Sequence, residues 1–425
     1  MEKLFCTGFG PADILLPKKE YEAVWSVVAC DQYTSEPEYW EETQRIVGDA
    51  PSTLKLIFPE IYLGEQGFEE RITHIHATME EYLSQGVFRT LENALILVRR
   101  TQADRKVRTG LVGAVDLECY DYAKGSVSPI RATEGTVLER IPPRVKIRNG
   151  AALELPHIML LTDDPNQTVI EPLSEQRDEF EKLYDIPLMQ NGGRVEGWLV
   201  PESEHGKVAA ALSALADGKA FAARYKKPES ECLVYAVGDG NHSLATAKAC
   251  YEQLKQSAGE DAAKASPARY ALVELVNLHD KALEFEAIHR VVFGVEPENL
   301  LGALRQRYNV AERAVEGGQS FTYLYGDKKG VLTVLNPEAN LTVGTLQRFL
   351  DEYCAERGGE TDYIHGADVV EKLSKKPNTI GFLLPDMGKS ELFPTVIFDS
   401  ALPRKTFSMG HAWDKRYYLE ARKIR

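Results

Sequence analysis

The sequence pattern changes from strand-like to helical between residues 231 and 248, where the chain reads ECLVYAVGDGNHSLATAK. Its first seven residues, Glu231–Val237, are mostly apolar and include valine and tyrosine, which is typical of a buried strand. Gly238 and Gly240 follow, and glycine permits the positive backbone φ angles that a tight turn requires. From Ser243 onward, apolar side chains recur at helical spacing. We therefore predict a strand, a glycine turn and a helix capped by Ser243.

This turn has the features of an anion site. A helix begins with backbone N–H groups that its own hydrogen-bond ladder does not use, and its aligned peptide dipoles place about half a positive charge there. Asp239 could hold a metal or an incoming hydroxyl, and His242 could donate a hydrogen bond to a phosphate oxygen. An ordinary tight turn, in which Asp239 and Ser243 only cap the helix, explains the same pattern equally well.

Better-known motifs do not fit the sequence. A dinucleotide-binding loop needs a third glycine where Ser243 stands. The segment Gly388-Lys389-Ser390 resembles the end of a P-loop, but Leu383 occupies the position of the first glycine. His74 and His76 are two residues apart on a predicted helix and face different sides of it, so we predict no metal site.

Helical and strand-like patterns alternate on both sides of the central unit. Gly67–Leu83 is a predicted helix, and Glu204–Tyr225 is a second one that is rich in alanine. Residues 93–117 form a predicted hairpin that turns at residues 103–106. No internal repeat divides the chain. The sequence therefore predicts a mixed α/β (α+β) protein.

The segment from Ile130 to Gly150 combines one carboxylate with several arginines. Glu134 lies close in sequence to Arg131, Arg140 and Arg144. A carboxylate among arginines is commonly a solvated ion pair. The functional alternative is a general base inside a phosphate-binding arginine cluster, and the residues alone leave both interpretations open.

Composition limits the classes of partner. The 425 residues include 50 Lys and Arg against 64 Asp and Glu, which gives a formal net charge of −14. Binding to nucleic acid or to an anionic membrane needs a basic face, so neither partner is expected. No run of about 18 apolar residues predicts a membrane-spanning helix. The six cysteines stand singly without a C-x-x-C pair, which favours a reduced, cytoplasmic protein.

Five blocks of sequence, in order, resemble one bacterial family. The blocks are Cys30–Tyr33 (CDQY), Ile130–Thr136 (IRATEGT), Gly238–Lys248 (GDGNHSLATAK), Ala287–Arg290 (AIHR) and Leu402–Ser408 (LPRKTFS). The family that they resemble is that of domain of unknown function 1015. The likeness extends over essentially the whole chain.

The resemblance implies a ParB/sulfiredoxin-like core with α/β elaborations at the N- and C-terminal ends, similar to the ADP-dependent free serine kinase. The implied regions are residues 1–125, 126–292 for the core and 293–425, although a single integrated unit also fits the sequence. The implied cofactor is a nucleotide, ADP or ATP, with Mg²⁺.

The resemblance also implies roles for particular residues. Glu134 would be the base that accepts a proton from a substrate hydroxyl, and Asp239 would be the second catalytic residue. The residues implied to bind the cofactor are Gly238, Gly240, Asn241, His242 and Ser243 in the turn, with Arg140, Arg144 and Arg290 elsewhere. The distant arginines are included because Ser243 replaces the arginine that is usual in the family, and Asn241 replaces a histidine.

These observations lead to two hypotheses about function. The first is a nucleotide-dependent kinase, a phosphotransferase that acts on a small hydroxylated, amino-acid-like metabolite. The alternative is a non-catalytic regulatory protein that binds a nucleotide or metabolite. Both expect a small-molecule ligand, and a homodimer is compatible with either. DNA binding of the ParB kind ranks last because of the acidic balance.

Overall fold

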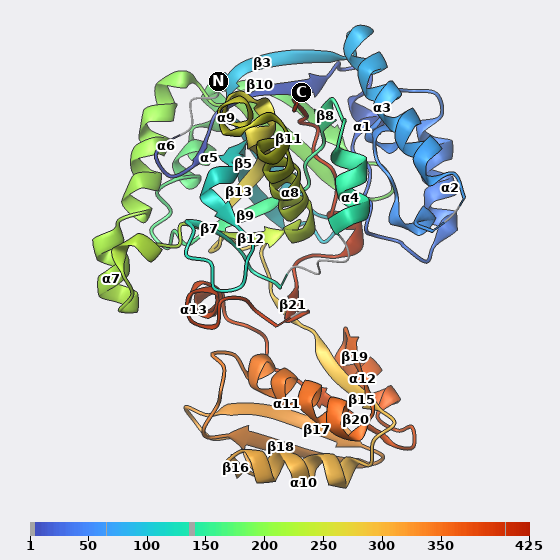
Figure 1. The fold of residues 1–425 in the computed structure, drawn as a ribbon, viewed down its shortest axis with the longest axis vertical. Coiled ribbons are helices and arrows are strands. Elements are labelled where there is room, and N and C mark those ends of the chain that lie inside the picture. The colour runs from blue at the N-terminus through green and yellow to red at the C-terminus, as the bar shows by residue number, and fades with distance from the viewer. Residues whose placement is uncertain (1–4, 65, 136–140, 404) are drawn as a thin grey trace. The chain divides into compact units, whose positions relative to one another are not determined.

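The computed structural model describes residues 5–64, 66–135, 141–403 and 405–425, and they form two compact units. Unit 1 contains residues 1–132, 136–283 and 410–425, and unit 2 contains residues 133–135 and 284–409. Both units combine helices with sheets (Figure 1), so the predicted mixed α/β class is confirmed. The three-region division and the ParB-like core stay predictions.

A large mixed sheet forms the centre of unit 1. Its strands are, in spatial order, β10 (Glu181–Pro187), β11 (Arg194–Leu199), β4 (Ile96–Thr101), β5 (Val107–Asp116), β13 (Tyr270–Asn277), β9 (Met159–Thr162), β12 (Tyr235–Asp239), β7 (Ile130–Ala132) and β6 (Tyr120–Asp121), with β1 (Phe9–Gly10) paired to β5. The predicted hairpin is β4–β5. Strand β12 runs parallel to β7 and antiparallel to β9, so it lies in the interior of the sheet.

Two smaller ribbons complete the strands of unit 1. They pair β2 (Ala12–Pro17) with β3 (Phe88–Ala94), and β8 (Leu153–Glu154) with β22 (Arg422–Lys423). The helices of this unit are α1 (Glu22–Trp25), α2 (Pro37–Val47), α3 (Phe68–Ser84), α4 (Ile141–Arg148), α5 (Glu171–Glu175), α6 (Glu202–Leu215), α7 (Gly218–Tyr225), α8 (Asn241–Ala258) and α9 (Glu260–Ala265). Helix α8 packs against α4 (Figure 1) through Ile141, Val145 and Ala245.

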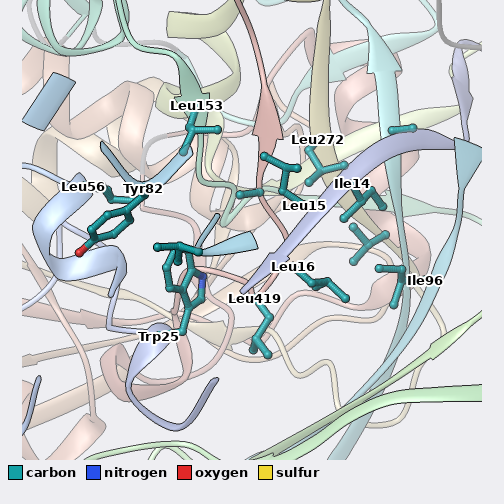
Figure 2. Packing of buried hydrophobic residues seen from close by; sticks show 14 of the residues in the cluster. Ile14, Leu15, Leu16, Trp25, Leu56, Tyr82, Ile96, Leu153, Leu272 and Leu419 are labelled. Atoms are coloured by element: carbon teal, nitrogen blue, oxygen red, sulfur yellow. The ribbon is translucent and has the colours of Figure 1, made fainter. Parts of the chain in front are cut away.

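The C-terminal segment is part of the core of unit 1. Leu419 lies in one buried cluster with Leu16 and Trp25 (Figure 2), although some 400 residues separate it from them in sequence. The backbone of Ala421 pairs with that of Leu15. Burial of these apolar side chains in one cluster ties the end of the chain to its beginning.

Unit 2 is an antiparallel sheet with helices. The sheet runs β16 (Val310–Ala311), β18 (Lys328–Val334), β17 (Gln319–Tyr325), β20 (Thr379–Leu383), β15 (His289–Phe293) and β19 (Glu360–Ile364), and β14 (Glu286–Ala287) pairs with β21 (Phe407–Ser408). Its helices are α10 (Pro297–Arg307), α11 (Thr342–Arg357), α12 (Ala367–Leu373) and α13 (Lys389–Asp399). In the part of the chain that the structure describes, no helix is long and apolar enough to cross a bilayer.

Candidate functional site

The turn between β12 and α8 has the predicted strand–turn–helix geometry. Gly240 adopts φ 79° and ψ 26° and is the residue that precedes the first turn of α8. A Cβ atom at Gly240 would lie 3.0 Å from both Cα and Cγ1 of Ile158. The prediction that Ser243 caps the helix was wrong, because α8 begins at Asn241 and Ser243 is already its third residue. Gly240 occupies the capping position, and its lack of a Cβ permits the left-handed conformation there.

The start of α8 is electrically positive and carries no acidic side chain. Its hydrogen-bond ladder begins where Leu244 N donates to Gly240 O over 3.0 Å, and the preceding amides point out of the helix end. Asp239 Oδ1 accepts a hydrogen bond from Gly240 N at 3.0 Å. The Gly388 turn that resembles a P-loop differs in that its acid lies inside the first turn of the helix, where Glu391 Oε2 accepts from Gly388 N at 2.7 Å.

A lysine from the far end of the chain stands beside this turn. Lys415 Nζ lies 3.7 Å from Asp239 Oδ1, and both side chains are about one quarter exposed. No motif marks Lys415 in the sequence, and 176 residues separate it from Asp239. The C-terminal segment therefore brings a cation to the start of α8.

Asp31 adds a second carboxylate to the same region. Desolvation opposes its ionisation, but the charges of His157, Lys415 and Arg144 and a hydrogen bond from Gln32 hold the pKa of Asp31 below its usual value. Asp31 is therefore ionised at neutral pH. The CDQY block contained this residue, but no pattern in the sequence assigned it a role.

A cavity of about 140 Å³ opens next to the first turns of α8. Much of its lining is apolar, and it includes Leu56, Phe58, Met79, Ile147, Leu153, Leu155, Ile158 and Leu272. Ser243, Thr246, His157, Cys30 and Tyr417 contribute polar groups, and Arg144, Arg148 and Glu154 contribute charged ones. The cavity is small beside the ~300–1,000 Å³ of drug-sized ligand sites, so it suits one part of a ligand.

A histidine links the cavity to the helix start. His157 Nε2 lies 3.2 Å from Ser243 Oγ, and its ring meets Tyr417 edge-on with 5.1 Å between ring centroids. Burial, reinforced by the charge of Asp31, raises the pKa of Cys30 to about 12. Cys30 is therefore a neutral thiol and not a nucleophile.

The arginines of the 130–150 segment already have partners. Arg144 forms an ion pair with Glu60, and Arg148 Nη2 donates to Glu154 Oε2 at 2.6 Å. Arg131 donates to the carbonyl oxygens of Ser128 and Glu231. Arg144 still lines the cavity, so the structure brings it together with Ser243. Arg140 lies outside the described residues.

The family assignment rests on most of the length of the chain. A family described as "protein of unknown function (DUF1015)" matches residues 11–353. The chain belongs to this family. The resemblance read from the five sequence blocks is thereby confirmed, and no curated protein matches the chain.

Several solved structures are similar to this DUF1015 chain. A mutant free serine kinase in complex with ADP shares 12% identity at a TM-score of 0.39, and the match covers 73% of this chain and 91% of that one. A conserved hypothetical protein from Pyrococcus furiosus shares 11% identity at 0.35, with coverage of 70% and 89%. SbnI from Staphylococcus aureus, truncated at its C-terminus, shares 12% at 0.36, with coverage of 70% and 82%.

The other turn residues of the DUF1015 chain differ in burial and in contacts. Asn241 is buried, and its Nδ2 donates to Val237 O at 3.4 Å, so its side chain faces back toward β12. Gly238 lies within β12 and is half-buried, as is His242, whose carbonyl oxygen accepts from Thr246 Oγ1 at 2.7 Å. The roles predicted for these three residues stay predictions.

Two predicted site residues belong to unit 2 of the DUF1015 chain. The backbone of Glu134 pairs with that of Leu402, and its predicted role as base stays a prediction. Arg290 is 0% exposed, and its guanidinium donates to Gln347 Oε1 at 2.5 Å and to Ile288 O at 2.6 Å. It also lies over the ring of Tyr363. These contacts hold the Arg290 side chain within unit 2, and its predicted contact with a phosphate stays a prediction.

Proposed function

We propose that this chain is a kinase-like phosphotransferase that binds a nucleotide phosphate at the start of α8 and transfers a phosphoryl group to a small hydroxylated metabolite. One observation carries the proposal: within unit 1, Lys415 stands beside an α8 start that has no acid in its first turn, next to a partly apolar cavity. The helix start and Lys415 would hold the anion, and the cavity would receive an uncharged part of a ligand.

The two carboxylates of the site supply the remaining chemistry. Asp239, at the end of β12, would hold Mg²⁺ bound to the phosphates. Asp31 is ionised and would accept the proton of the substrate hydroxyl as the hydroxyl oxygen attacks the terminal phosphorus of the nucleotide. The bond from that phosphorus to the bridging oxygen would break, and the nucleotide would leave with one phosphate fewer. Asp31 is preferred to Glu134 for this step because Asp31 and the start of α8 belong to the same unit.

A specific observation favours the alternative of a non-catalytic binding protein. Arg144 and Arg148 are paired with Glu60 and Glu154, so neither is a ready phosphate clamp for a transition state. Positioning and charge neutralisation supply most of the rate in phosphoryl transfer. A site that relies on a helix start and one lysine could bind a nucleotide without transferring its phosphate.

Titration calorimetry with AMP, ADP and ATP, with and without MgCl₂, tests the binding. We expect at least one nucleotide to bind the full chain, and Lys415→Met to weaken its affinity about tenfold because it removes the cation beside Asp239. Lys389→Met, at the first position of α13, is the matched control and should leave the affinity unchanged. Absence of binding by all three nucleotides would refute the proposal.

A second measurement separates the two candidate functions. Phosphoryl transfer from the bound nucleotide is assayed against a panel of hydroxylated metabolites with the wild type and with Asp31→Asn. A kinase should lose turnover in the variant while keeping its nucleotide affinity, since the carboxylate acts on the second substrate. Tight nucleotide binding with no turnover by either protein would favour the regulatory alternative.

A further inference from the structure

Another cavity lies deep in unit 1, and nothing in the proposed function uses it. It lies between strands of the main sheet and the C-terminal segment, and its polar lining is Arg100, Arg108, Glu274, Glu420, Ser26 and the two tyrosines 417 and 418. Its volume is about 10 Å³. A space of this size holds one water molecule or one monatomic ion and excludes phosphate, sulfate or a carboxylate ligand.

Arg100 lines this cavity, and its side chain carries unsatisfied donors. Its side chain comes from β4, and the residue is only 4% exposed. Its Nε and Nη2 atoms have no hydrogen-bond partner among the residues that the structure describes. A buried charged group without partners is costly, so native proteins rarely leave one in this state.

Neighbouring arginines increase the positive charge. Arg100 stands directly opposite Arg108 in the register of β4 and β5. Arg108 binds the carboxylate of Glu274, with hydrogen bonds of 3.2 and 2.7 Å. Arg416 donates to three backbone carbonyls, at Trp413, Ser26 and Met189. Burial, with the charges of Arg108 and Arg416, lowers the pKa of Arg100 to about 9, although Asp414 and Glu274 partly oppose this.

Glu420 does not balance this charge at acidic pH, where its carboxyl is protonated. Burial raises the pKa of its carboxyl to about 7, and Tyr184 donates a hydrogen bond to it at 2.7 Å. Glu274 from β13 adds a negative charge that also raises the pKa. The other charged or titratable groups that line the cavity are Arg100 from β4, Arg108 from β5 and Tyr417 and Tyr418 of the C-terminal segment. With Glu420 protonated, the charged groups that line the cavity are two arginines and one carboxylate.

We propose that this cavity is a binding site for a single monatomic anion, such as chloride, held by Nε and Nη2 of Arg100. The anion would satisfy both donors and neutralise the excess charge in a space that no larger anion can enter. Ionisation of Glu420 would place a second negative charge on the cavity wall and expel the anion. The inference does not depend on nucleotide binding, because it uses no residue at the start of α8.

Thermal unfolding of the full chain in sodium chloride and in sodium gluconate, at equal ionic strength, gives the first test. At pH 6 we expect chloride to raise Tm by about 1–3 °C in a saturable manner. Arg100→Met should abolish the difference, whereas Arg99→Met should keep it, because Arg99 is the neighbouring residue of β4 and pairs with Glu196. Equal Tm values of the wild type in the two salts would contradict the proposal.

Glu420→Gln and a bromide soak make the test independent of whether the arginine variant folds. The chloride effect of the wild type should disappear at pH 8.5, and Glu420→Gln should retain it there because the amide cannot ionise. In crystals soaked in sodium bromide at pH 6, an anomalous peak is expected beside Arg100 Nε. Density for water alone at that position would overturn the proposal.

Discussion

Gly240 holds a backbone conformation that other residues adopt only with strain, and it does so where the chain is also crowded. Its φ of 79° lies in the left-handed region, and Ile158 approaches within 3.0 Å of the place where a Cβ would stand. Ile158 also lines the cavity beside α8. We expect Gly240→Ala to lower the free energy of unfolding by about 2–4 kcal/mol, from backbone strain and crowding together. Chemical denaturation measures this change.

Gly67 is the matched control for that substitution. It too precedes a helix, α3, and has φ 88° and ψ 18°, but only the flexible end of Glu70 lies near its missing Cβ, at 3.9 Å. Gly67→Ala should therefore cost only the strain, about 1–2 kcal/mol. Equal losses at the two positions would show that the approach of Ile158 does not restrict the turn.

Asp217 explains why the structure has two helices where the sequence predicted one. The alanine-rich pattern of Glu204–Tyr225 predicts a continuous helix, but α6 ends at Leu215 and α7 begins at Gly218. Asp217 Oδ1 accepts hydrogen bonds from Lys219 N at 2.8 Å and Ala220 N at 3.3 Å. Asp217→Ala should lower the free energy of unfolding by about 1 kcal/mol, whereas Asp217→Asn, which keeps the accepting oxygen, should cost much less. Equal losses in urea denaturation would exclude a capping role.

The elements that sequence predicted well are those whose signal is local. The period of Gly67–Leu83 and the hairpin of residues 93–117 depend on neighbouring residues, and α3 and β4–β5 match them. The β12 turn was predicted from its glycines for the same reason. The site around it was not, because Lys415 and Asp31 reach it through pairing of distant segments, such as that of Val28 with Arg416. The residue pattern of a single sequence does not indicate which distant segments pair.

At the scale of the whole molecule, the N-terminal and C-terminal parts of the chain fold together in unit 1. The chain leaves unit 1 after Leu283 and returns to it at Gly410. Within the returning segment, Leu419, Ala421 and Ile424 are buried in the main core of unit 1. Composition predicted an ordinary globular core but could not indicate that the last 16 residues complete it.

Removal of residues 410–425 should therefore unfold unit 1. The deletion removes three buried apolar side chains from the core, and each large one that is lost lowers the free energy of unfolding by about 2–5 kcal/mol. It also removes Arg422, which binds Glu154 Oε1 at 2.7 Å, and leaves that buried carboxylate without this partner. These losses rival the ~5–15 kcal/mol that stabilises a typical domain. Hydrogen exchange measured by mass spectrometry should show peptides of unit 1 losing protection.

A chain that lacks only Arg425 is the control for this deletion, because Arg425 is exposed and removing it leaves Ile424 in place. That chain should exchange as the full protein does, apart from a small effect of the lost ion pair with Glu80. Unit 2 has its own buried cluster, which includes Val291, Leu324 and Val370, so its peptides should stay protected even without residues 410–425. Undiminished protection of unit 1 in the chain without residues 410–425 would contradict this prediction. It would mean that the rest of the core keeps unit 1 folded without the segment that brings Lys415 to α8.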